Sequence, residues 1–313
     1  MVTGGAGFIG CNIVAELVSR GEAVRVLDNL ATGLESNLSE FGSDVEMVRG
    51  DIRDASAVRE AMRGATHVLH LAALGSVPRS IEDPATSNDV NVSGTLNVLT
   101  AARDEGVSRV VFSSSSSVYG ASQELPKRVG HPTDPVSPYA TTKQAGESYT
   151  RVFWRVYGLP TVALRYFNVF GPKQRPDSAY AAVIPKFMAW ALAKEPLVVH
   201  GDGLQARDFT YVTNVVSANL LAAEAEAEGV AGEVFNIACG SSFTLLDIAG
   251  ALEKAVGHPL ARQHTPARAG DVRKSQADIE PAAAALGYRV LVGFEEGLAQ
   301  TWQAFCRRFG TAA

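Results

Sequence analysis

The sequence has few cysteines, no run of basic residues and no long apolar segment, and each absence excludes a class of protein. Its three cysteines (Cys11, Cys239 and Cys306) are odd in number and far apart, which argues against a disulfide framework or a zinc site and favours a reducing compartment. The net charge of −5, without a Lys/Arg-rich run, argues against a basic surface that binds nucleic acid or an anionic membrane. No segment reaches the ~18 apolar residues of a membrane span, and no secretory signal pattern opens the chain. We therefore expect a soluble cytoplasmic protein without a metal site.

Apolar β-branched runs alternate with helical patterns through the first half of the chain, which predicts an α/β fold with a doubly wound parallel sheet. The expected strands are 23–28, 45–48, 67–73, 109–114 and 161–166, and the expected helices between them include 85–104 and 139–157. Later the pattern loosens to helices at 182–194, 213–228 and 244–256 and a strand at 233–238. We expect a Rossmann-type domain over 1–165 and a smaller C-terminal α/β domain over most of 166–313. The boundary is approximate, and later segments of the chain can belong to the first domain.

The first ten residues, "MVTGGAGFIG", contain a glycine fingerprint in two overlapping spacings, Gly5-x-Gly7-x-x-Gly10 and Gly4-x-x-Gly7-x-x-Gly10. Such glycines let backbone N–H groups approach a pyrophosphate at a helix N-terminus. Asp28 ends the next expected strand, eighteen residues after Gly10, where a carboxylate bonds ribose hydroxyls and selects NAD over NADP.

Two alternatives stay open around this fingerprint. Asp28 could be a turn residue at a strand end, and Asp51 in "GDIRD" could be either an adenine partner or a turn residue. Only Met1 and Val2 precede Thr3, although the first strand of such a sheet is central. We therefore expect either that the natural reading frame begins a few residues upstream or that the short strand lowers stability.

The segment "SPYATTKQAGE" places Tyr139 and Lys143 one helical turn apart, so their side chains share a face. A free tyrosine has a pKa near ~10, and a neighbouring ammonium together with a cationic nicotinamide ring would favour its phenolate as a base. Five serines at 113–117 end a predicted strand, where ligands lie in such sheets. The alternatives are a surface Tyr–Lys pair and a polar serine loop.

With these motifs the sequence resembles the extended short-chain dehydrogenase/reductases, and within them the nucleotide-sugar 4-epimerases related to UDP-galactose 4-epimerase. The matching pieces run nearly end to end: "TGGAGFIG", "DNL", "GDIRD", "HLAA", "NVSGTLNVL", "FSSSSSVYG", "SPYATTK", "LRYFNVFGP", "GDGLQARDFTYV", "FNIACG" and "ARAGDVRKSQAD". The resemblance implies a Rossmann domain with tightly held NAD, a C-terminal domain for the UDP-sugar, and a homodimer formed through helices of the nucleotide domain.

The resemblance also implies roles for individual residues. The catalytic hydroxyl, base and lysine match Ser115, Tyr139 and Lys143. Cofactor positions match Gly4, Gly7, Phe8, Ile9, Gly10, Asp28, Asn29, Leu30, Thr32, Gly33, Asp51, Ile52, Leu71, Ala72, Ala73, Asn91, Ser113, Tyr139, Lys143 and Tyr166. Substrate positions match Gly75, Ser76, Ser115, Ser116, Ser117, Asn168, Ala182, Val183, Val198, His200, Arg207, Arg268, Asp271 and Ser275. The alternative for Arg207 and Arg268 is a structural ion pair.

The implied reaction is oxidation at C4 of the sugar, rotation of the 4-keto sugar, and re-reduction on its other face, so that NAD is not consumed. Ser116 and Ser117 stand where dehydratases and decarboxylases of the family carry acidic residues, which disfavours those reactions. Gly75 and Ser275 are small where enzymes restricted to UDP-glucose and UDP-galactose carry larger residues, and His200 stands where an aromatic often stacks on uracil. These positions favour UDP-N-acetylglucosamine and UDP-N-acetylgalactosamine, with UDP-glucose and UDP-galactose as further candidates. UDP-glucuronate 4-epimerase, a non-epimerising NAD dehydrogenase and a nucleotide-sugar sensor are the alternatives.

Overall fold

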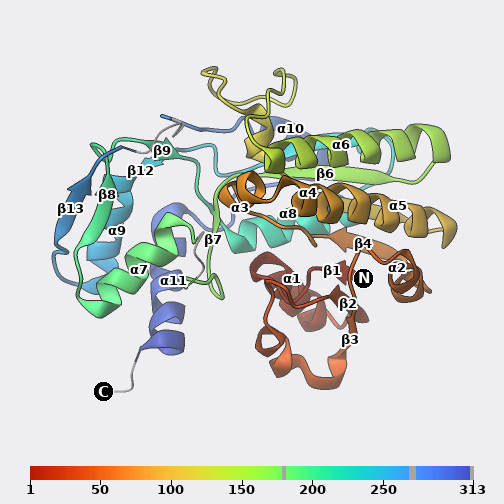
Figure 1. Cartoon of the computed structure of the whole chain (residues 1–313), viewed down its shortest axis with the longest axis horizontal. Coiled ribbons are helices and arrows are strands. Elements are labelled where there is room, and N and C mark those ends of the chain that lie inside the picture. The colour runs from red at the N-terminus through yellow and green to blue at the C-terminus, as the bar shows by residue number, and fades with distance from the viewer. Residues whose placement is uncertain (178–180, 268–272, 311–313) are drawn as a thin grey trace.

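The computed structural model describes residues 1–177, 181–267 and 273–310. A large parallel sheet with helices on both faces makes up one part of the molecule, and short strands with further helices make up the other (Figure 1). The predicted doubly wound parallel fold is confirmed.

The main sheet has seven parallel strands in the order β11-β6-β5-β4-β1-β2-β3. Its strands are β1 (Val2–Thr3), β2 (Val24–Asp28), β3 (Val45–Arg49), β4 (His67–His70), β5 (Arg109–Ser115), β6 (Thr161–Tyr166) and β11 (Glu233–Ile237). Strands inside the sheet are buried on both faces, as their continuous apolar runs predict; all six residues of β6, which lies between β11 and β5, are buried. The short β1 is central and pairs Val2 with Val26 on one side and with Leu69 on the other.

Helices cover both faces of this sheet (Figure 1). One face carries α2 (Ala55–Met62), α5 (Gly94–Asp104) and α6 (Pro138–Tyr157), and the other carries α1 (Phe8–Ser19) and α8 (Val212–Glu224). α6 begins where Ser137 caps it by accepting a hydrogen bond from the backbone N–H of Ala140, and it ends at the left-handed Gly158. These two signals fix the helix that carries the predicted catalytic pair.

The helix predicted at 85–104 is interrupted. It consists of α4 (Pro84–Asn88), a π-helical turn (Asp89–Ser93) and α5, preceded by the short α3 (Val77–Glu82). The π turn inserts one residue into the helical repeat, which the apolar periodicity does not reveal. The interruption lies at the sheet's carboxyl edge and contains Asn91.

The second part of the molecule contains the later elements. They are β7 (Val169–Phe170), α7 (Val183–Ala193), β8 (Leu197–His200), β9 (Ala206–Arg207), β10 (Thr210–Tyr211), β12 (Phe243–Thr244), α9 (Leu245–Val256), β13 (Arg262–Thr265), α10 (Glu280–Leu286) and α11 (Phe294–Phe309). Short 3-10 segments occupy Glu35–Asn37, Ser39–Asp44 and Ser116–Tyr119. Because β11 pairs with β6 and α8 covers the main sheet, the chain returns to the main sheet after residue 166. In the described ranges, every helix is too short or too polar to cross a lipid bilayer.

Candidate active site

A tight glycine loop joins β1 to α1. Gly4 has a φ of +69°, and a Cβ on it would lie 2.7 Å from the amide nitrogen of Ala72. A Cβ on Gly10 would lie 2.2 Å from the carbonyl oxygen of Gly4. Gly7 is the N-cap of α1, and within the described residues neither a capping side chain nor an acidic residue occupies the first turn. The loop therefore offers uncapped N–H groups and the positive end of a helix, which fits the pyrophosphate of NAD.

Asp28 ties this loop to the segment that follows β2. It is buried, and its two carboxylate oxygens accept hydrogen bonds from the backbone N–H groups of Ala6 at 3.0 Å and Leu30 at 2.8 Å. A Cβ on Gly33 would lie 2.8 Å from the carbonyl carbon of Ala6. Because each carboxylate oxygen can accept a second bond, Asp28 can also accept from ribose hydroxyls, and that role stays a prediction.

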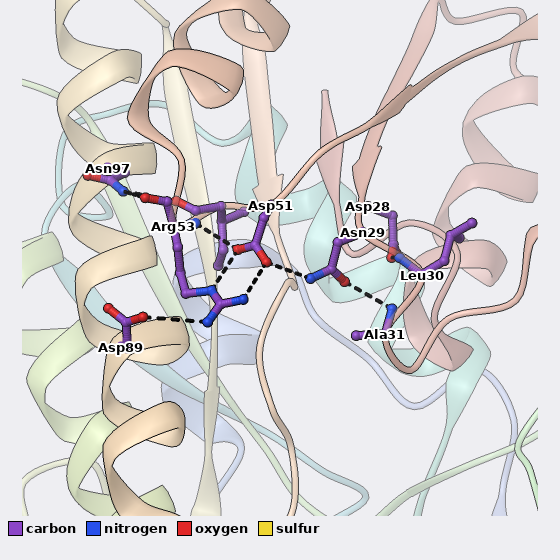
Figure 2. A network of polar contacts seen from close by, with 9 residues as sticks. Asp28, Asn29, Leu30, Ala31, Asp51, Arg53, Asp89 and Asn97 are labelled. Carbon is purple, nitrogen blue, oxygen red and sulfur yellow. Dashed lines mark hydrogen bonds and ion pairs between the residues drawn. The ribbon is translucent and has the colours of Figure 1, made fainter.

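Asp51 lies in a polar network that also holds Arg53 and Asn29 (Figure 2). One oxygen of Asp51 accepts from the backbone N–H of Arg53 at 2.9 Å and from its Nε at 3.1 Å. The other oxygen accepts from Nη2 of Arg53 and from Nδ2 of Asn29, both at 2.8 Å. Arg53 Nη1 also lies 3.6 Å from a carboxylate oxygen of Asp89, and Asn97 Nδ2 donates to the Arg53 carbonyl at 3.0 Å.

These hydrogen bonds, those of the Arg53 side chain first, hold the pKa of the Asp51 carboxyl well below its usual range. The four donors occupy the roughly four lone-pair positions of the carboxylate, so an adenine amine at Asp51 would have to share or replace one of them. The sequence analysis identified Asp51 but not Arg53, although Arg53 follows Asp51 by only two residues in "GDIRD".

The predicted catalytic residues meet where β5 ends beside α6. Lys143 Nζ donates to the carbonyl oxygen of Ser113 at 2.7 Å and lies 5.9 Å from the centroid of the Tyr139 ring. Tyr139 shares a side-chain hydrogen bond with Ser115. Ser115 Oγ accepts from the backbone N–H of Ser117 at 3.2 Å and from its hydroxyl at 2.9 Å. The strand end and the helix face thus place a hydroxyl, a phenol and an ammonium together, as the spacing predicts.

Burial governs the protonation of both titratable groups. It raises the pKa of Tyr139, and the hydrogen bond with Ser115 opposes that rise. It lowers the pKa of Lys143 to about 8, and the charge of Glu147 opposes that fall. In the protein alone, therefore, the phenol is protonated at neutral pH, and the lysine by itself does not reverse the effect of burial.

Asn91, in the π-helical turn, connects the loop after β4 to α6. Its side-chain oxygen accepts from the backbone N–H of Leu74 at 2.8 Å, and its Nδ2 donates to Thr142 Oγ1 at 3.0 Å. Thr142 Oγ1 donates in turn to the carbonyl oxygen of Tyr139 at 2.8 Å. Asn91 is therefore part of the scaffold beneath the predicted base.

The other predicted cofactor residues lie along the same sheet edge. Thr32, Ile52, Leu71, Ala72 and Ala73 follow the carboxyl ends of β2, β3 and β4, while Ser113 lies two residues before the end of β5 and Tyr166 ends β6. The Tyr166 hydroxyl donates to Asn219 at 2.9 Å, and burial raises its pKa to about 12.

A cavity of about 300 Å³ lies between the end of β6, α7 and β8. Six predicted substrate residues line it: Asn168, Ala182, Val183, Val198, His200 and Arg207. Sequence reasoning missed other lining side chains, including Lys186, Trp190, Gln205 and Phe209. The described residues that line the cavity include basic side chains and no carboxylate, which suits an anionic ligand.

The remaining predicted substrate residues lie near the catalytic residues, near the cavity, or outside the described residues. Gly75 and Ser76 precede α3, and Ser76 caps that helix by accepting from the Arg79 backbone N–H at 3.2 Å. Ser116 and Ser117 follow β5. The backbone N–H of Ser275 donates to the carbonyl oxygen of Ala206 at 3.0 Å, beside Arg207. Arg268 and Asp271 lie outside the described residues.

The chain is similar to known proteins over most of its length. The model of the NAD dependent epimerase/dehydratase family matches residues 1–238. A UDP-N-acetylglucosamine 4-epimerase from Methanobrevibacter ruminantium, solved with UDP-N-acetylmuramic acid, is 37% identical with a TM-score of 0.93, covering 98% of both chains. The UDP-glucose 4-epimerase of Thermus thermophilus, solved with NAD, is 38% identical with a TM-score of 0.88, covering 99% of both. A UDP-glucuronate 4-epimerase of Thermodesulfobacterium geofontis is 33% identical over 96% of this chain and 94% of that one.

Proposed function

The chain belongs to the NAD-dependent epimerase/dehydratase family and is a UDP-sugar 4-epimerase, and we propose that it interconverts UDP-N-acetylglucosamine and UDP-N-acetylgalactosamine. The observation that carries the sugar preference is the small side chain of Ser275. It lies next to the β9 strand, which supplies Arg207 to the cavity. A small residue there leaves room for an acetamido group at C2, and Gly75 supports the same choice.

Within this proposal, Tyr139 takes the proton from the 4-hydroxyl of the sugar while Ser115 hydrogen-bonds the same oxygen. Lys143 stays an ammonium ion that favours the phenolate, and its bond to the Ser113 carbonyl fixes its position. NAD, when bound, supplies the hydride acceptor and a positive charge. A positive charge beside Tyr139 favours its phenolate form, whereas burial alone raises its pKa and keeps the phenol protonated. After the sugar turns over, Tyr139 returns the proton to the 4-oxygen.

The UDP moiety has a separate anchor in this account. Asn168 and Arg207 line the cavity. We propose that they hold the diphosphate and the uridine together with Arg268 and Asp271, which lie outside the described residues. Guanidinium groups suit the geometry of a diphosphate. Anchoring the nucleotide while the sugar rotates lets either face of C4 meet the same catalytic residues, which an epimerase requires.

A UDP-glucuronate 4-epimerase is the second candidate. It is favoured by the serine run before "VYG" and by the similarity to the enzyme of Thermodesulfobacterium geofontis. The basic lining of the cavity does not separate the two candidates, because both substrates carry a diphosphate.

The test is the conversion of UDP-N-acetylglucosamine, UDP-glucose and UDP-glucuronate by the purified protein, followed by separation of the epimers. We expect the highest kcat/KM for UDP-N-acetylglucosamine. A higher value for UDP-glucuronate would overturn the proposed sugar preference in favour of the second candidate.

We also propose that the protein is a cytoplasmic homodimer. Three large apolar side chains on α6, Val152, Val156 and Tyr157, are 46%, 66% and 50% exposed and lie within one and a half turns of each other. Light scattering after gel filtration is expected to give twice the mass of the chain, and a Val156→Lys variant is expected to shift it toward the monomer. A monomeric wild-type protein would contradict this.

A further inference from the structure

A buried ion pair begins one helical turn after the proposed catalytic lysine, and it has no role in the reaction described above. Glu147 and Arg165 are 6% and 4% exposed. Arg165 Nε and Nη2 donate to the two carboxylate oxygens of Glu147 at 2.8 and 2.7 Å, and the hydroxyl of Ser114 donates to the same carboxylate. The Arg165 guanidinium carbon also lies 4.7 Å from the centroid of the Tyr119 ring.

Glu147 continues the row of predicted catalytic residues along α6. Tyr139, Lys143 and Glu147 follow at intervals of four along α6, so they form one row on the helix. On β5, the Ser113 carbonyl receives the Lys143 ammonium and the Ser114 hydroxyl bonds Glu147. Successive turns of α6 are therefore joined to successive residues of β5.

We propose that Glu147 is a positioning residue for Lys143. Its carboxylate, one helical turn away, keeps the lysine in the ammonium form on the Ser113 carbonyl, and Arg165 limits how much of that negative charge Lys143 experiences. The inference rests on the proposed role of Lys143 as the cation beside the base.

The charges around Lys143 support this assignment. The described titratable groups that interact with it are Tyr139 and Glu147 on α6 and His70 on β4, and Arg165 on β6 binds Glu147. His70 is fully buried, and burial together with the Lys143 charge lowers its pKa to about 3, so it is neutral at physiological pH. Burial lowers the pKa of Lys143 to about 8, and Glu147 is the group that opposes this shift. A lysine with such a pKa would lose part of its charge near neutrality without Glu147.

A purely structural ion pair is the alternative, because removing one partner of a buried pair is destabilising whatever its neighbours do. The two explanations predict different changes in the pKa of Lys143. If charge matters, Glu147→Gln lowers the pKa of Lys143 and Arg165→Gln raises it. If only packing matters, both variants lose stability and neither moves that pKa.

The experiment compares Glu147→Gln, Arg165→Gln and the double variant Glu147→Gln/Arg165→Gln, which removes both charges and leaves no unpaired ion. Lys143 is titrated by NMR in protein labelled at lysine Cε, with Lys143→Met identifying its signal. We expect its pKa to fall by about one unit in Glu147→Gln, as a charge one helical turn away predicts, to rise in Arg165→Gln, and to lie between these two values in the double variant. The alkaline limb of kcat should move in the same directions.

Circular dichroism identifies the variants that fold, and the folded ones decide the question. If Arg165→Gln does not fold, the difference between Glu147→Gln and the double variant still carries the test. Equal Lys143 pKa values in all folded variants would overturn the proposal. Because the NMR titration needs no substrate, it is independent of the proposed function, which would fail separately if no UDP-sugar were converted.

Discussion

Replacing Ser275 with tyrosine would place a phenol ring where the chain has one of its smaller side chains. Ser275 is half-buried, and its hydroxyl is buried without a hydrogen-bond partner among the described residues. Its backbone is fixed by the hydrogen bond to the Ala206 carbonyl, next to Arg207 in the cavity wall. A larger side chain therefore has to enter volume that is either packed or open to the substrate.

The size of the effect follows from the packing. Overfilling a packed site commonly costs about 1–3 kcal/mol, which corresponds to roughly 5- to 150-fold in rate. An acetamido group at C2 sweeps more space than a hydroxyl when the sugar turns over, so it meets the new ring first. We expect kcat/KM for the two N-acetylated UDP-sugars to fall by about tenfold or more. The values for UDP-glucose and UDP-galactose should change little.

The assay measures kcat/KM for both substrate pairs in the wild type, in Ser275→Tyr and in the matched control Ser275→Ala, which adds no volume. The control should keep the wild-type ratio between the pairs. An unchanged ratio in Ser275→Tyr would refute the assignment of Ser275 as the residue that admits the acetamido group, and a parallel fall for both pairs would indicate a loop-capping role instead.

Three other substitutions test the rest of the site. Tyr139→Phe should still bind the UDP-sugar and lose about 10²- to 10⁴-fold in kcat, as expected for lost acid–base catalysis; near-normal turnover would remove the phenol from the mechanism. Gly10→Ala should lower the melting temperature and the NAD content, because its Cβ would lie 2.2 Å from a backbone carbonyl oxygen; unchanged values of both would contradict the tight loop. Arg53→Gln should weaken NAD binding about two- to fivefold by loosening Asp51, whereas Arg103→Gln, which breaks a comparable exposed ion pair, should not; equal affinities in the two variants, measured by fluorescence titration, would exclude this role.

Much of the fold could be predicted because its signals are local. Continuous apolar runs such as β6 indicate strands buried on both faces, and the Ser137 cap and Gly158 mark the ends of α6. The one-turn spacing of Tyr139 and Lys143 was sufficient to place them on one helix face, and a strand end was sufficient to place Ser115 beside them.

The rest depends on contacts between segments far apart in the chain. Arg165 lies inside an apolar strand and Glu147 inside a helix, and only the packing of α6 on β5 and β6 shows that they form a buried pair. The π-helical turn around Asn91 leaves the apolar pattern nearly unchanged. The strand at 233–238 has the composition of any buried strand, so its pairing with β6 in the main sheet is not readable from its own residues.

Return of the hydride to C4 is tested by incubating the purified protein, without added NAD, with UDP-N-acetylglucosamine deuterated at C4 of the sugar. We predict that UDP-N-acetylgalactosamine forms and keeps its deuterium at C4, because the hydride removed from the sugar is returned to the same carbon. Failure to form the epimer, or an epimer that carries hydrogen from water at C4, would contradict it.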